Sequence, residues 1–133
     1  MPNRQQLAEI ASAGYRVVIN LAYDESPAQL PGEAELVDEL GMVYIHIPVE
    51  WENPKIDDLS QFFAAMIQNQ DEQVFVHCVA NYRVSAFMYL YRILHLGEHS
   101  EQAWHDLTRV WTPEGIWRDF ITLALNQPSG TWD

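Results

Sequence analysis

The stretch VFVHCVANYRVSAF, residues 74–87, brings a thiol and a guanidinium close together. Cys78 is the one cysteine of the 133-residue chain, and Arg83 follows it five positions later. Apolar and β-branched residues precede Cys78, so a buried strand is expected to end there and a helix to follow. A helix N-terminus stabilises anions, and a nearby arginine adds to this effect. Cys78 is therefore a candidate nucleophile at the mouth of an anion-binding loop.

The segment between Cys78 and Arg83 must curl tightly if its N–H groups are to converge on one anion. Besides Cys78 and Arg83, the residues expected at such a site are His77, Val79, Ala80, Asn81, Tyr82, Val84 and Ser85. A tight curl generally needs a residue that tolerates a positive φ, and this loop has no glycine. Asparagine enters the left-handed region more readily than most residues. We therefore expect Asn81 to take that conformation.

Segments typical of helices and strands alternate along the chain. Hydrophobic patterns predict strands at residues 15–22, 42–49 and 73–78. Helices are predicted at residues 4–13, 33–40, 58–67, 85–96, 99–111 and 113–126. This order indicates an α/β fold with a parallel-core sheet flanked by helices. We expect one domain over residues 1–126 and a C-terminal tail over 127–133, which Trp132 could pin.

Several finer features are expected from local signals. Asp57 is a candidate cap for the third helix and Ser100 for the fifth, while Pro113 suits the start of the last helix. Three strands are few for a parallel sheet. A fourth is therefore expected in one of the loops or upstream of Met1.

The composition narrows the range of partners. The formal net charge is −12, from 7 basic and 19 acidic residues, so nucleic acids and anionic membrane surfaces are not expected partners. No apolar run has the roughly 18 residues that a membrane helix requires. The first residues lack the apolar core of a secretory signal, and a single cysteine suits a reducing compartment. The sequence predicts a cytoplasmic location.

The central stretch resembles the signature of cysteine-dependent protein phosphatases, in particular the compact dual-specificity branch and its bacterial relatives. That signature reads His-Cys, five residues with a central glycine, then Arg and Ser or Thr. His77, Cys78 and Ser85 fall on its ends, and Asn81 falls on its glycine. The order of elements over nearly the whole chain is also similar to that fold.

This resemblance implies hydrolysis of phosphate monoesters through a phosphocysteine intermediate, with a phosphorylated protein or small molecule as substrate. The guanidinium and the loop amides would hold the phosphoryl group, and Ser85 would either aid breakdown of the intermediate or cap the helix. His77 would support the thiolate. Free phosphate or sulfate could occupy the loop. No metal or other cofactor is expected, since the histidines show no ligand spacing with Cys or carboxylates.

Two positions depart from the family's pattern. With Ser85 kept in register, Val84 stands where the family has its arginine, and Arg83 comes one position early. The alternative is a shorter loop, Cys-x4-Arg, which is the loop length of rhodanese-like sulfurtransferases.

The second departure concerns the general acid. The family carries an aspartate in the loop after the second core strand, whereas residues 47–54 contain no Asp and place Trp51 at that position. Glu50, with Glu52 behind it, is the replacement that we expect, because burial against Trp51 would favour a protonated carboxyl.

Four functional interpretations follow. The leading one is a phosphatase, with weak activity because of these departures. The others are a rhodanese-like sulfurtransferase holding a persulfide on Cys78, a phosphate-binding module without catalysis, and a protein-binding domain in which Cys78 is an inert core residue.

Overall fold

Three parallel strands form the centre of the molecule. The computed structural model describes residues 2–23, 30–128 and 130–132. Within them the strands are β1 (Val17–Asn20), β2 (Val43–His46) and β3 (Val74–His77), in the sheet order β2-β1-β3. Val17 lies beside Val43 on one side and Val74 on the other, so the carboxyl ends of all three strands meet at one edge. The predicted α/β fold with a parallel sheet is confirmed.

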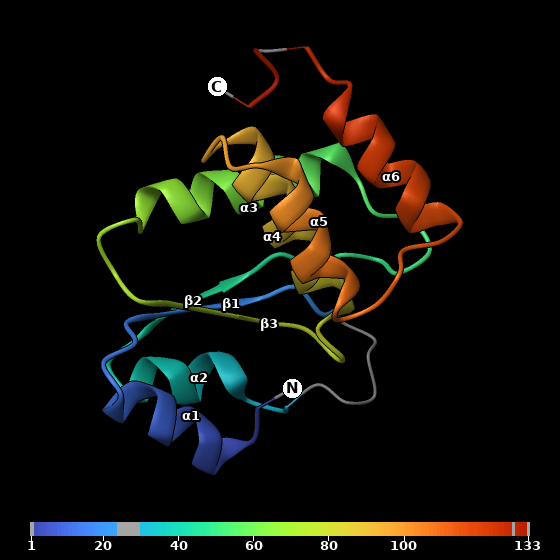
Figure 1. Cartoon of the computed structure of the whole chain (residues 1–133). Helices are drawn as coiled ribbons and strands as arrows, with labels where there is room; N and C mark the ends of the chain where they lie inside the picture. Colours follow the sequence, from blue (N-terminus) through green and yellow to red (C-terminus); the bar gives the residue numbers. More distant parts are fainter. Residues whose placement is uncertain (1, 24–29, 129, 133) are drawn as a thin grey trace.

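Helices cover both faces of this sheet (Figure 1). The helices α1 (Arg4–Ser12) and α2 (Glu33–Glu39) lie on one face. Four helices lie on the other: α3 (Ile56–Gln68), α4 (Tyr82–Leu94), α5 (Ser100–Thr108) and α6 (Ile116–Leu125). Within the described residues, no helix has both the length and the apolar character that crossing a membrane requires.

The alternation of side chains along the strands divides the core in two. Val18 points to the α1 and α2 side, where it packs in a small cluster with Leu7 and Val37. Val17 and Ile19 point to the other side and join a much larger cluster that the four later helices supply. β1 is buried along its whole length, as expected for the central strand of a parallel sheet covered on both faces.

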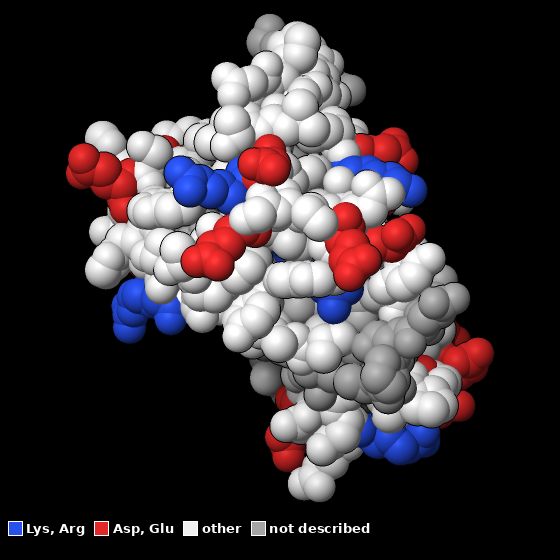
Figure 2. Space-filling view, turned by 90° about the vertical axis from the view of Figure 1, so that its right-hand side faces the viewer, with Lys and Arg blue, Asp and Glu red and all other residues white. Residues whose placement is uncertain are grey.

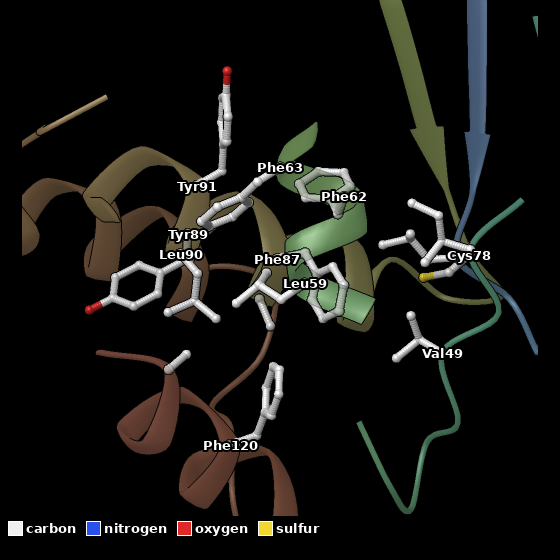
Figure 3. Close-up of a cluster of buried hydrophobic side chains, with 14 of the residues drawn as sticks. Val49, Leu59, Phe62, Phe63, Cys78, Phe87, Tyr89, Leu90, Tyr91 and Phe120 are labelled. Atoms are coloured by element: carbon white, nitrogen blue, oxygen red, sulfur yellow. The ribbon is translucent and has the colours of Figure 1, made fainter. Parts of the chain in front are cut away.

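The larger cluster is rich in aromatic rings (Figure 3). Phe62 and Phe63 of α3 meet Phe87 and Tyr91 of α4 with ring centroids 5.6 to 6.2 Å apart. Trp132 packs on Phe63 at 4.9 Å, so the tail is pinned as predicted. Cys78 belongs to the same cluster, which means that the site is built at the border of the core.

Local helix signals were less reliable than the element order. α4 begins at Tyr82, three residues before the predicted start, so the loop after β3 is correspondingly short. Asp57 does not cap α3; instead Asp58 accepts a hydrogen bond from the Lys55 N–H at 3.2 Å. Ser100 is the first residue of α5 and His99 its cap, and α6 begins at Ile116, behind Gly115. No fourth strand occurs in the described ranges.

Candidate active site

A cavity opens at the carboxyl edge of the sheet, where Cys78 follows β3. Its volume is about 260 Å³, and its lining residues are Trp51, Cys78, Val79, Ala80, Tyr82 and Arg83. Ligands of open α/β sheets collect at this edge, because the strands end there and the next helix presents free N–H groups. The structure thus brings the predicted thiol and guanidinium into one pocket.

Arg83 is the positive group of this pocket. Its residue is 8% exposed, and its Nη1 donates a hydrogen bond of 2.8 Å to the carbonyl of Val49, in the loop after β2. Among the described residues no carboxylate forms an ion pair with Arg83, although the chain has many more acidic than basic groups. A buried charge without a counterion is costly. An anion in the cavity would therefore be stabilised by this guanidinium.

Asn81 makes the turn between strand and helix. Its φ is 67° and its ψ is 0°, and it is the one residue other than glycine with positive φ in the described parts of the chain. The predicted left-handed conformation is confirmed. Asn81 is also the N-cap of α4, and its carbonyl accepts the first helical hydrogen bond, from the Ser85 N–H at 2.9 Å. Through this turn Arg83 falls within the first turn of α4 although only four residues separate it from Cys78.

Cys78 itself is 1% exposed. Figure 3 shows it at the end of the strands beside Val49, at the border of the apolar cluster. The sulfur is thus largely covered by hydrocarbon, but the same residue lines the cavity that contains the guanidinium. A structural and a chemical role are compatible at this position.

Trp51 gives the cavity an aromatic wall. Its ring lies 6.2 Å from that of Tyr82 and 5.4 Å from those of Trp111 and Trp117. Trp117 also donates a hydrogen bond of 2.8 Å to the Trp51 carbonyl, which fixes the loop after β2. The spacing of Trp111 and Trp117 indicates core or groove-wall positions, but these residues are far from Trp51 in sequence, so their contact with it was not predicted.

Glu50 is half-buried next to Trp51 but is not among the residues that line the cavity. Burial is the main cause that raises the pKa of Asp58, and the negative charge of Glu50 adds to it. Glu50 therefore lies near the start of α3. Glu52 is exposed.

Other predicted residues lie outside the pocket. Val84 packs against the core, and the Ser85 hydroxyl donates to the Tyr82 carbonyl at 2.7 Å while accepting from Trp111 Nε1 at 2.9 Å. His77 points to the opposite face of the sheet, where it and Asn81 line a different cavity.

A buried polar network surrounds His77. Its Nε2 lies 2.6 Å from Oε2 of Glu33, the first residue of α2, and both side chains are almost fully buried. The other oxygen of Glu33 accepts hydrogen bonds from Asn20 Nδ2 at 3.0 Å and Tyr44 OH at 2.9 Å. Burial raises the pKa of Glu33, but the hydrogen bond and charge of His77, with the Tyr44 and Asn20 bonds, outweigh it and lower the pKa. We did not predict this network, because a glutamate at a helix start is usually exposed.

Comparison with known proteins identifies the family. No protein-family model and no curated protein matches the chain. Among solved structures, a "Putative phosphatase (DUF442)" from Shewanella putrefaciens CN-32 is 42% identical, with a TM-score of 0.83, over 93% of this chain and 82% of that one. The chain belongs to the DUF442 family of phosphatase-like proteins.

More distant structures share the fold of this DUF442 protein. TpbA of P. aeruginosa, in a complex with phosphotyrosine, has a TM-score of 0.72 at 15% identity and covers 99% of this chain and 80% of its own. The catalytic domain of the PP-IP phosphatase SIW14 of S. cerevisiae, in a complex with citrate, has a TM-score of 0.73 at 12% identity and covers 92% and 76%. The predicted resemblance is confirmed in two respects: the family is phosphatase-like, and the fold is shared with these two structures.

In this chain, the described residues contain no group of three or more His, Cys, Asp or Glu side chains placed to hold a metal ion. The acidic side chains on the face seen in Figure 2 lie in several separate groups, with basic side chains beside and between them.

The left-handed turn at Asn81 generates the first prediction. Asn81→Gly should leave the free energy of unfolding within about 0.5 kcal/mol of the wild type, because glycine adopts positive φ without strain. Asn81→Ala should lower it by about 1 to 2 kcal/mol, the cost of a Cβ in this region. Urea unfolding measures both. Equal stabilities of the Gly and Ala variants would show that the turn is not left-handed.

The lowered pKa of Glu33 generates a pH-dependent prediction. A carboxyl with a lowered folded-state pKa stabilises the fold above its ordinary pKa of 4.5, and this contribution disappears as the pH falls through the lowered value. Glu33→Gln should cost about 1.5 to 3 kcal/mol at pH 7, the value of hydrogen bonds to a charged group. The gap between the two proteins should narrow below pH 4.5 in urea unfolding. A gap that is constant from pH 7 to pH 3.5 would contradict the assignment.

Proposed function

We propose that this protein is a cysteine-dependent phosphatase of the protein-tyrosine or dual-specificity type, which hydrolyses phosphate monoesters. The observation that carries the proposal is the shared cavity of a buried thiol and a buried guanidinium without a described carboxylate partner. Membership of the DUF442 family supports the same reaction class. The substrate is a phosphorylated protein or small molecule, and free phosphate or sulfate competes for the pocket.

The chemistry proceeds in two steps. Arg83 and the loop amides bind the phosphoryl oxygens, and the Cys78 thiolate attacks phosphorus opposite the ester oxygen. The phosphorus–oxygen bond breaks as the sulfur–phosphorus bond forms, and the departing oxygen takes a proton from an acid. Water then attacks the phosphocysteine and releases inorganic phosphate. The protein's own groups position the phosphoryl group and stabilise its charge. We propose that the reaction takes place in the cytoplasm.

Glu50 is the proposed acid. It follows Val49, whose carbonyl binds Arg83, and precedes Trp51, which lines the cavity. Val49 and Trp51, the two neighbours of Glu50, thus connect the loop after β2 to the proposed phosphate-binding loop. In this proposal the Glu50 carboxyl reaches the leaving oxygen when the substrate is bound.

Four residues lie between Cys78 and Arg83, and this Cys-x4-Arg loop length also favours a second candidate, a rhodanese-like sulfurtransferase. In that reaction Cys78 would accept the outer sulfur of thiosulfate as a persulfide, and Arg83 would hold the departing sulfite. The same purified protein tests both candidates.

The first experiment compares wild type, Cys78→Ser and Arg83→Lys. Wild type should hydrolyse p-nitrophenyl phosphate, Cys78→Ser should show no turnover, and Arg83→Lys should lose about 10²- to 10³-fold in kcat/KM, as for loss of a charge-stabilising donor. Phosphate release measured by absorbance gives these values. Thiosulfate turnover without phosphatase activity would favour the sulfurtransferase. Vanadate binding without either activity would favour a non-catalytic module.

The second experiment tests the acid. Glu50→Gln should lower kcat by about 10²-fold for an alkyl phosphate, whose leaving oxygen needs a proton, and much less for p-nitrophenyl phosphate, whose leaving group is stable as an anion. Glu52→Gln is the matched control and should retain activity on both. Equal rates of Glu50→Gln and wild type on the alkyl phosphate would exclude Glu50.

A further inference from the structure

We propose that Glu33 is a positioning residue of the catalytic loop, acting through His77 on the orientation of Cys78. This inference rests on the proposed function, since it concerns the rate of the same reaction. Glu33 lies in the α2 layer, on the face of the sheet opposite the cavity of Cys78.

The carboxylate of Glu33 ties all three strands to one helix. It accepts from Asn20 at the end of β1, from Tyr44 in β2 and from His77 at the end of β3. Asn20 in turn accepts from the Ala22 N–H at 2.8 Å through its Oδ1. Every oxygen of the Glu33 side chain therefore has a partner at the edge where the cavity opens.

This arrangement determines the proton position on His77. An ionised carboxylate can only accept hydrogen bonds, so the contact of 2.6 Å requires a proton on Nε2 of the imidazole. The Nδ1 of His77 is a buried nitrogen without a hydrogen-bond partner among the described residues. The orientation of the ring thus depends on Glu33 rather than on a bond at each nitrogen.

The ring orientation bears on Cys78 because the two residues are consecutive. The carbonyl of His77 accepts from the Leu21 N–H at 2.8 Å, so the backbone is held on one side by β1 and the side chain by Glu33. Release of the ring would let the peptide before Cys78 rotate. In-line attack tolerates little displacement, since a misplacement of about 1 Å can cost about 10²-fold in rate.

Binding of the anion depends on other contacts. Arg83 is held by the Val49 carbonyl, and neither residue bonds to Glu33. A change at Glu33 should therefore lower kcat more than it weakens binding of phosphate analogues.

Glu33→Gln is a sharp test because it keeps the shape and changes the hydrogen bonding. Asn20 and Tyr44 both donate to Oε1, so the Gln carbonyl should take that place and turn its NH₂ toward His77. The imidazole Nε2 must then accept, and a neutral ring carries its proton on Nδ1. The variant should thus invert the tautomer of His77.

The experiment uses the whole chain in three forms: wild type, Glu33→Gln and Glu35→Gln. Glu35 is an exposed acidic residue of the same helix turn and makes the matched control. Nitrogen-15 NMR of the imidazoles should find His77 protonated at Nε2 in wild type and in Glu35→Gln, and at Nδ1 in Glu33→Gln. With p-nitrophenyl phosphate, Glu33→Gln should lose at least about tenfold in kcat. Its KM and its vanadate inhibition constant should stay within about threefold, and Glu35→Gln should match wild type.

Tyr44→Phe separates positioning from general stability. It removes one donor from the same carboxylate but keeps the His77 bond, so the melting temperature should fall while the Nε2 proton and kcat are retained.

Three results would overturn the inference: a wild-type His77 without a proton on Nε2, a folded Glu33→Gln with wild-type kcat, or a loss of about tenfold or more in kcat in Tyr44→Phe. The first and third can be read even if Glu33→Gln does not fold. Absence of any phosphatase turnover in wild type would instead refute the proposed function.

Discussion

The structure is organised around a buried positive charge. Arg83 lies in the first turn of α4 and reaches back to the carbonyl of Val49, which joins the loop after β3 to the loop after β2. Among the described residues it has no acidic partner, in a chain of net charge −12. Such a guanidinium is most stable with an anion beside it. The left-handed turn at Asn81 and the early start of α4 are what place it there.

Burial of Cys78 does not conflict with chemistry at its sulfur. The thiol packs in the large apolar cluster beside Val49, and it lines the same cavity as the guanidinium. An inert core cysteine with Arg83 pointing into solvent would have supported the protein-binding interpretation. Instead the guanidinium is buried in the wall of that cavity. A shielded site also strengthens the attraction of a guanidinium for an anion, because water no longer screens the two charges.

Sequence patterns predicted the parts of the fold that depend on neighbours along the chain. Local signals predicted the order of helices and strands along the chain and the glycine-like conformation of Asn81. They also predicted that Cys78 and Arg83 lie in one pocket. The two predicted N-caps failed by small offsets along the chain: Asp58 rather than Asp57 bonds at the start of α3, and His99 rather than Ser100 is the cap of α5. The Trp51 wall and the Glu33 network join residues far apart in sequence, and no spacing reports such contacts.

The period of two along β3 sends consecutive side chains at its end into different layers. Cys78 faces the large helical layer, and His77, one residue earlier, faces α1 and α2. The cavity that Cys78 lines on one face and the carboxylate network on the other therefore share a single peptide unit. Because the sheet is buried on both sides, that peptide can move only if one layer repacks, which is costly in a close-packed interior. A thin parallel sheet can thus hold the strand end that carries Cys78 rigidly when each face fixes one of two consecutive side chains.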